Sequence, residues 1–113
     1  MSSYSEIAQA GIWIKANSNQ SDLIMTQSRP QIVYYSERPV QRGDLDMFAN
    51  KSYFEEIVEE LKPRYLVLSL YEQSPEWIYS YPEKNPNKLT PVQVYYQNQK
   101  PIVVIYEFKY TQF

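Results

Sequence analysis

The sequence predicts a three-layer α/β/α domain of Rossmann-like shape whose mixed sheet ends in an antiparallel hairpin. Helix and strand patterns alternate along the first two thirds of the chain, as they do in α/β folds. Residues 65–70 are almost continuously apolar, which is typical of a sheet strand covered by helices on both faces. Two more strand-like stretches lie close together near the C-terminus, and 113 residues suffice for a single domain, 1–113.

The first predicted helix runs from Ser5 to about Ala16. Ser3 and Glu6 have the spacing of a capping box at its start. The polar run 17–22 ends this helix in a turn, and residues 23–26 form a short buried strand. The apolar residues of this first helix recur with helical spacing: Ile7, Ala10, Gly11 and Ile14.

The segment between residues 31 and 41 is less distinct. Residues 31–35 fit a helix or a strand, and we favour a helical turn. Residues 38–41 predict a short outer strand, with Pro39 at its start, where a missing amide donor is tolerated near a sheet edge.

Two further helices are predicted. Ser52 and Glu55 form a second capping box and Pro63 ends the first of these helices, whose apolar stripe is Phe54, Ile57, Val58 and Leu61. Ser74 as N-cap and Pro75 at the first helical position open the second, which extends to about Tyr81. An irregular connection with Pro82, Pro86 and Pro91 follows.

The chain ends in the two hairpin strands, 92–96 and 102–110, joined by residues 97–100. Residues 102–105 are apolar on both alternating faces. We therefore expect the last strand to lie beside residues 65–70 and not at a sheet edge.

Composition excludes several classes of function. The chain has no cysteine and no histidine, so it lacks thiolate and imidazole metal ligands, disulfides and every catalytic triad that uses histidine. A net charge of −2 without a basic cluster argues against nucleic-acid binding. No apolar stretch approaches the ~20 residues that cross a bilayer. No catalytic constellation is evident, and we expect no metal and no cofactor.

The N-terminal segment has neither a basic region nor an apolar region of a secretory signal. This has two interpretations. The protein is cytoplasmic, or the chain is a domain of a larger protein whose earlier segments direct it.

Acidic residues allow two weaker hypotheses. Asp44 and Asp46 flank a turn at Gly43 and are interpreted as turn residues, since no further carboxylate follows at calcium-loop spacing. The acidic set on the third predicted helix lies opposite its apolar stripe and is interpreted as a solvated face: Glu55, Glu56, Glu59 and Glu60.

The candidate ligand site lies at the carboxyl ends of the strands, where α/β sheets bind ligands. Gln27, Ser28 and Arg29 follow one strand there. Arg29 and Arg38 can bind an anionic or sugar-bearing ligand through their planar guanidinium groups, or they can hold loops in place, and both interpretations stay open. A carboxylate pair for glycoside cleavage has only Glu37 and Glu72 as loop candidates, and the sequence does not bring them together. The candidate ligand-binding residues are Arg29, Tyr35, Arg38, Glu72, Gln73 and Ser74.

The chain has twelve tyrosines, and it also has Trp13 and Trp77. Such side chains suit partner surfaces, sugar stacking and membrane interfaces, but they also serve as core and strand residues, which is the interpretation we favour for Tyr65, Tyr95 and Tyr106. The two tryptophans fall on predicted helices and are expected to cover the sheet.

Several segments together resemble a known domain. They are, in order, residues 10–14 (Ala-Gly-Ile-Trp-Ile), a turn closing on Asp22, the strand 23–26, Arg29-Pro30, residues 34–39 (Tyr-Tyr-Ser-Glu-Arg-Pro) and residues 62–68 (Lys-Pro-Arg-Tyr-Leu-Val-Leu). This order resembles the soluble C-terminal domain that follows the multi-spanning region in bacterial and archaeal membrane glycosyltransferases of the dolichyl-phosphate-mannose protein mannosyltransferase-like type (family 39). Ser36 and Glu37 stand where that pattern has Thr-Gly, so this turn departs from the pattern, and Glu adopts positive φ less readily than Gly.

The resemblance implies a non-catalytic accessory role, because the family's acidic catalytic residues lie in its membrane region. It implies an extracytoplasmic location, and as partner the transmembrane region of the parent protein or a glycan or lipid-linked sugar acceptor. The alternative hypothesis is a free-standing cytoplasmic Rossmann-like module that binds a small molecule at the strand ends.

Overall fold

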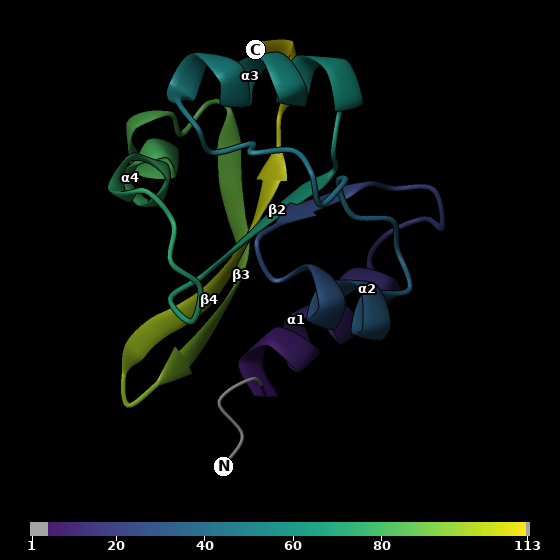
Figure 1. The fold of residues 1–113 in the computed structure, drawn as a ribbon. Helices are drawn as coiled ribbons and strands as arrows, with labels where there is room; N and C mark the ends of the chain where they lie inside the picture. Colours follow the sequence, from purple (N-terminus) through teal and green to yellow (C-terminus); the bar gives the residue numbers. More distant parts are fainter. Residues whose placement is uncertain (1–4, 113) are drawn as a thin grey trace.

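The computed structural model describes residues 5–112 of the chain. A four-stranded sheet carries four α-helices in this part, and the order of elements runs from purple to yellow in Figure 1. The prediction of a mixed α/β fold with a C-terminal hairpin is confirmed. The elements are α1 (Ser5–Ala16), β1 (Ile24–Thr26), α2 (Arg29–Ser36), α3 (Lys51–Leu61), β2 (Tyr65–Ser69), α4 (Glu76–Lys84), β3 (Leu89–Gln97), β4 (Lys100–Phe108) and the short 3₁₀ helix Tyr110–Gln112.

The sheet has the strand order β1-β2-β4-β3. β1 and β2 are parallel, with Met25 opposite Leu66, whereas β4 runs antiparallel to both β2 and β3. The last strand therefore lies inside the sheet beside β2, as its apolar sequence predicts.

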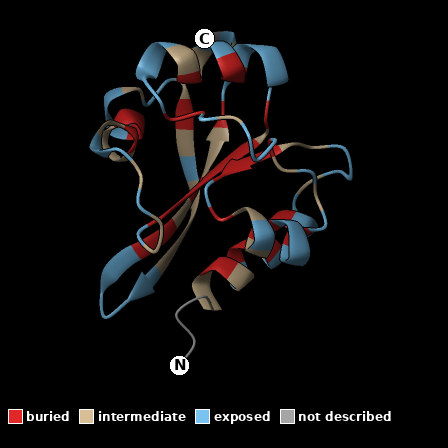
Figure 2. Cartoon of the chain, viewed as in Figure 1, coloured by how far each residue is buried: buried red, intermediate tan, exposed pale blue. Residues whose placement is uncertain are grey.

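Side chains of β2 alternate between two cores, one on each face of the sheet. Leu66 and Leu68 point toward α3 and α4, and Tyr65 and Val67 point toward α1 and α2. Buried residues of these helices complete the cores: Phe54, Ile57, Val58, Ile78 and Tyr81 on the first face, and Ile7, Ala10, Ile14 and Ile32 on the second. Trp77 packs against the first core and Trp13 against the second, as predicted. Figure 2 shows the buried residues along the centre of the sheet and the inner sides of the helices.

The hairpin turn is tighter than predicted. Gln97 pairs with Lys100, so only Asn98 and Gln99 form the turn, with φ angles of 53° and 67°. Positive φ at both central residues matches the right-handed twist of the strands. Both strands consequently extend further toward the turn than the apolar pattern indicates.

The outer strand predicted at residues 38–41 is reduced to an isolated parallel bridge at the sheet edge, in which Ile24 N donates to Pro39 O at 2.8 Å and Gln41 N donates to Ile24 O at 3.2 Å. Only Val40 forms a bridge, to Ile24 of β1. Further along the edge of β1 the partner is the buried side chain of Gln41, whose amide accepts from Thr26 N at 3.0 Å and donates to Thr26 O at 2.8 Å. A side-chain amide thus occupies the place of a neighbouring peptide group.

Three predicted helix boundaries also need correction. α3 is capped by Asn50, whose side chain accepts from Tyr53 N at 2.8 Å, and not by Ser52. The N-cap of α4 is Pro75 and not Ser74. α4 continues through Pro82 to Lys84, because the proline ring is buried in the last turn, where its packing offsets the lost backbone hydrogen bond. The predicted capping box at Ser3 lies outside the described residues.

Candidate functional site

The loops that follow the parallel strands β1 and β2 meet at the carboxyl ends of these strands. Ser28 is buried and its Oγ donates to Oε2 of Glu72 at 3.1 Å. Tyr79 Oη fixes the same loop by donating to the backbone oxygens of Glu72, at 3.0 Å, and Ser69, at 3.1 Å. Gln73 is exposed and Ser74 half-buried beside this contact. A ligand-binding role for these residues stays a prediction.

Arg29 is the first residue of α2, near the carboxyl end of β1, and it holds the loop that contains Gln41. Its Nε donates to the backbone oxygen of Gln41 at 2.7 Å. Its guanidinium lies against Gly43, where a Cβ would approach Nη1 to 2.8 Å. A side chain at position 43 would displace the Arg29 guanidinium, which fixes the chain that carries Gln41 to the edge of β1.

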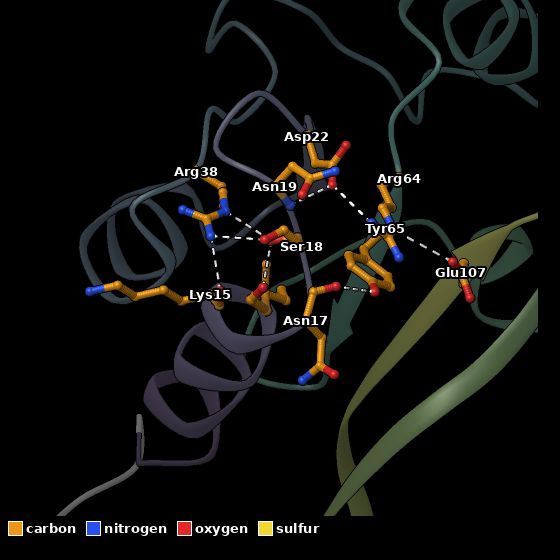
Figure 3. A network of polar contacts seen from close by, with 10 residues as sticks. Lys15, Asn17, Ser18, Asn19, Asp22, Arg38, Arg64, Tyr65 and Glu107 are labelled. Atoms are coloured by element: carbon orange, nitrogen blue, oxygen red, sulfur yellow. Dashed lines mark hydrogen bonds and ion pairs between the residues drawn. The ribbon is translucent and has the colours of Figure 1, made fainter.

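Arg38 lies beyond the opposite end of α2 and holds the loop between α1 and β1 (Figure 3). It donates to Ser18 Oγ at 2.8 Å, to Lys15 O at 2.9 Å and to Ser18 O at 3.0 Å. These backbone and hydroxyl acceptors belong to the last turn of α1 and to the loop that follows it, which matches the loop-holding reading of this arginine. Arg29 and Arg38 use their side chains on different loops.

The same loop is joined to the sheet by a second set of contacts in Figure 3. Asp22 accepts from Asn19 N at 2.8 Å and from Arg64 Nη1 at 3.0 Å. The bond from Asn19 N, and next the Arg64 guanidinium, lower the pKa of the Asp22 carboxyl. Tyr65 Oη donates to Asn17 O at 2.8 Å, and burial raises the pKa of this phenol. The network therefore orders the turn between α1 and β1.

Tyr35 and Glu37 lie near the end of α2. The Tyr35 ring packs edge-on against Tyr34, with ring centroids 4.9 Å apart. Glu37 has φ 56° and ψ 33°, and its N donates to Val33 O at 3.0 Å. The left-handed C-cap that suits glycine is thus formed by glutamate here. Glu37 pairs with Lys15 at 2.6 Å, whereas Glu72 accepts from Ser28, so the two carboxylates have different partners.

One residue of the predicted solvated acidic face has another role. Glu56, Glu59 and Glu60 are exposed as predicted. Glu55 instead accepts from Tyr81 Oη and, at 2.9 Å, from Lys88 Nζ. Burial alone raises the pKa of Glu55, but these two hydrogen bonds outweigh it and lower the pKa. Glu55 therefore joins α3 to α4 and to the chain that enters β3.

The described residues contain no group of three or more acidic side chains that could hold a metal ion, and none of their helices is long and apolar enough to cross a membrane. Asp44 is exposed in its turn and pairs with Arg42 at 3.0 Å.

No family model and no curated protein matches the chain. Among solved structures, the chain is similar to the crystal structure of the C-terminal globular domain of an oligosaccharyltransferase, AglB-S2, from Archaeoglobus fulgidus. The alignment covers 96% of this chain and 100% of that domain, with a TM-score of 0.62 and 16% sequence identity. The two chains share a fold. Sequence reasoning pointed to the soluble domain of a different type of glycosyltransferase, so the coarse resemblance is supported and the family 39 assignment is not.

Proposed function

We propose that this chain is a non-catalytic accessory domain of a membrane-bound glycosyltransferase-like protein. The observation that carries the proposal is the fold similarity to an oligosaccharyltransferase C-terminal domain over nearly the full length of both chains. Segments such as Arg29-Pro30 and 34–39 resemble the same kind of domain, a soluble C-terminal domain of a membrane glycosyltransferase, although of another family. Both lines lead to C-terminal domains of proteins that transfer sugars.

The role we assign is recognition of an acceptor or glycan, or packing against the transmembrane region of the parent protein, on the extracytoplasmic side. We also propose that the domain is a three-layer, Rossmann-like fold. The helices that cover both faces of the sheet support this assignment. Charged side chains that could serve catalysis are used in holding loops, as Arg29, Arg38 and Glu55 show. This supports an accessory role, in which sugar transfer takes place elsewhere in the parent protein.

A second candidate is a binding module that uses the edge at Ser28 and Glu72. The contact between their side chains favours it, because it brings the carboxyl ends of two parallel strands together. The exposed Gln73 beside this contact is available to a small polar ligand.

Deletion of this domain from the native protein tests the proposal. The truncated protein is expected to stay in the membrane fraction while sugar transfer to its acceptor falls at least tenfold. The matched control carries the full domain with Gln9→Ala, at an exposed position of α1, and leaves transfer within about twofold. Unchanged transfer after deletion, or a native polypeptide without apolar segments of ~20 residues, overturns the proposal.

A further inference from the structure

The β3–β4 hairpin carries a mainly apolar groove on the face of the sheet that α3 and α4 cover only in part. Two hollows of about 570 and 280 Å³ adjoin there, and they share Pro101, Val104 and Tyr106. In Figure 1 the turn end of the hairpin projects beyond α4, and Figure 2 shows its tip as exposed. The larger hollow lies within the usual size of small-ligand pockets, about 300–1,000 Å³.

The groove exists because helix cover ends part-way along the hairpin. Leu89 at the start of β3 is only 1% exposed beneath the helices, whereas Tyr96 near the turn is 60% exposed. Val94 and Val104 face each other between these points and are half-buried. Apolar sheet surface that the fold leaves uncovered is therefore continuous with the core.

Polar side chains also line this mainly apolar groove. Thr90 borders the larger hollow, but it lies opposite Glu107, which shares the other face of the sheet with Tyr65, so its buried Oγ1 points away from the groove. Glu83 and Lys109 line the same hollow and supply an acceptor and a donor. Burial, and next the charge of Glu83, raise the pKa of the Tyr106 phenol, which stays protonated and able to donate.

This combination matches the chemistry of a sugar. A pyranose ring has apolar C–H faces, which pack on tyrosine and proline rings, and a rim of hydroxyls, which need donors and acceptors. An added peptide strand fits less well. Pro91 on the outer strand has no amide hydrogen, and the β3–β4 register shifts between Pro91 and Gln93 and again between Tyr95 and Tyr96, which blunts the edge.

We propose that the groove of the β3–β4 hairpin is a carbohydrate-binding site, with the Tyr96 and Tyr106 rings as its stacking surface and Glu83 and Lys109 as its polar anchors. This proposal rests on the proposed function, and it names the part of the domain where glycan recognition takes place.

Nuclear magnetic resonance titration of the domain with neutral trisaccharides of mannose, glucose and N-acetylglucosamine tests this assignment. With at least one of them, saturable amide shifts are expected around Thr90, Val94, Val104 and Tyr106. Tyr96→Ala is expected to weaken binding about tenfold, the scale of one stacked ring. Lys109→Met removes the ammonium donor while keeping most of the length of the side chain, and it is expected to weaken binding about threefold to tenfold, through loss of one hydrogen bond.

The matched control is Tyr34→Ala. Tyr34 is 74% exposed on α2, and its loss leaves affinity unchanged. Shifts that saturate at Ser28 and Glu72 overturn the groove assignment but leave glycan recognition standing. Dimerisation through the hairpin, or no shift with any of the sugars, also overturns the assignment, and the domain-deletion experiment then decides the accessory role separately.

Discussion

Gly11 on α1 lies where a side chain has no room, so Gly11→Ala is expected to destabilise the protein. A Cβ at this position would lie 2.6 Å from Tyr35 Cβ, 3.2 Å from Ser36 N and 3.3 Å from Tyr35 C. Two of these atoms belong to the backbone of α2, so rotation of a side chain cannot relieve the contact. The two helices would have to separate by about 1 Å at this point, and overpacking of this kind costs about 1–3 kcal/mol.

Alanine also favours a helix over glycine by about 1 kcal/mol, which offsets part of this cost. Because real Cβ atoms essentially never show a 2.6 Å contact, the cost lies in the upper part of the overpacking range, about 2–3 kcal/mol. The expected net loss is therefore about 1–2 kcal/mol, or a melting temperature lower by about 4–12 °C. Urea unfolding followed by circular dichroism measures it. Gln9→Ala, at an exposed position of the same helix, is the control and should change the free energy of unfolding by less than about 0.5 kcal/mol. An unchanged or higher stability of Gly11→Ala would refute the close packing of α1 on α2.

Three further substitutions test contacts described above. Glu37→Gly relieves a left-handed backbone and loses only an exposed ion pair, so the melting temperature should rise by about 2–5 °C; a fall would show that the C-cap is not strained. Arg38→Lys cannot reproduce the planar fork, so amide hydrogen exchange in residues 17–22 should quicken about tenfold, and exchange at the wild-type rate contradicts the loop-holding role. The lowered pKa of Glu55 stabilises the folded state above the pKa of the unfolded chain, and this contribution is lost as the pH falls through the folded pKa. Glu55→Gln should therefore cost about 1 kcal/mol at pH 7 and flatten the loss of stability between about pH 5 and 3; an acid limb identical to that of the wild type argues against the pairing.

Sequence reasoning was most successful where a local pattern decides the structure. The stripe of Phe54, Ile57 and Val58 predicts α3, and the apolar run at residues 102–105 places β4 inside the sheet. Such patterns show which side chains are buried, and burial largely determines whether a segment forms a helix or a strand and where it lies in the fold.

The errors concern features that depend on residues distant in sequence. Gln41 serves β1 as a strand partner only because Arg29 fixes its loop, and no local pattern announces this. Glu55 follows the spacing of a solvated face, but its carboxylate turns toward Tyr81 and Lys88 from later parts of the chain.

The candidate site shows the same division. The meeting of Ser28 with Glu72 follows from the parallel strands β1 and β2. The hairpin groove does not follow from sequence, because it depends on where α4 ends above the sheet. Tyr106, which lines it, is interpreted from the sequence as a core or strand residue and Tyr96 is not singled out, and only the structure separates the buried Tyr65 from the exposed Tyr96.

The central claim is that this fold serves as an accessory domain of a larger, membrane-bound sugar transferase. Its most direct test is an immunoblot of fractionated native cells with an antibody raised against the purified domain. The account predicts a polypeptide several times larger than the 13.5 kDa of this chain that stays with the membranes after alkaline carbonate extraction. A band of 13.5 kDa that is released into the soluble fraction would contradict it.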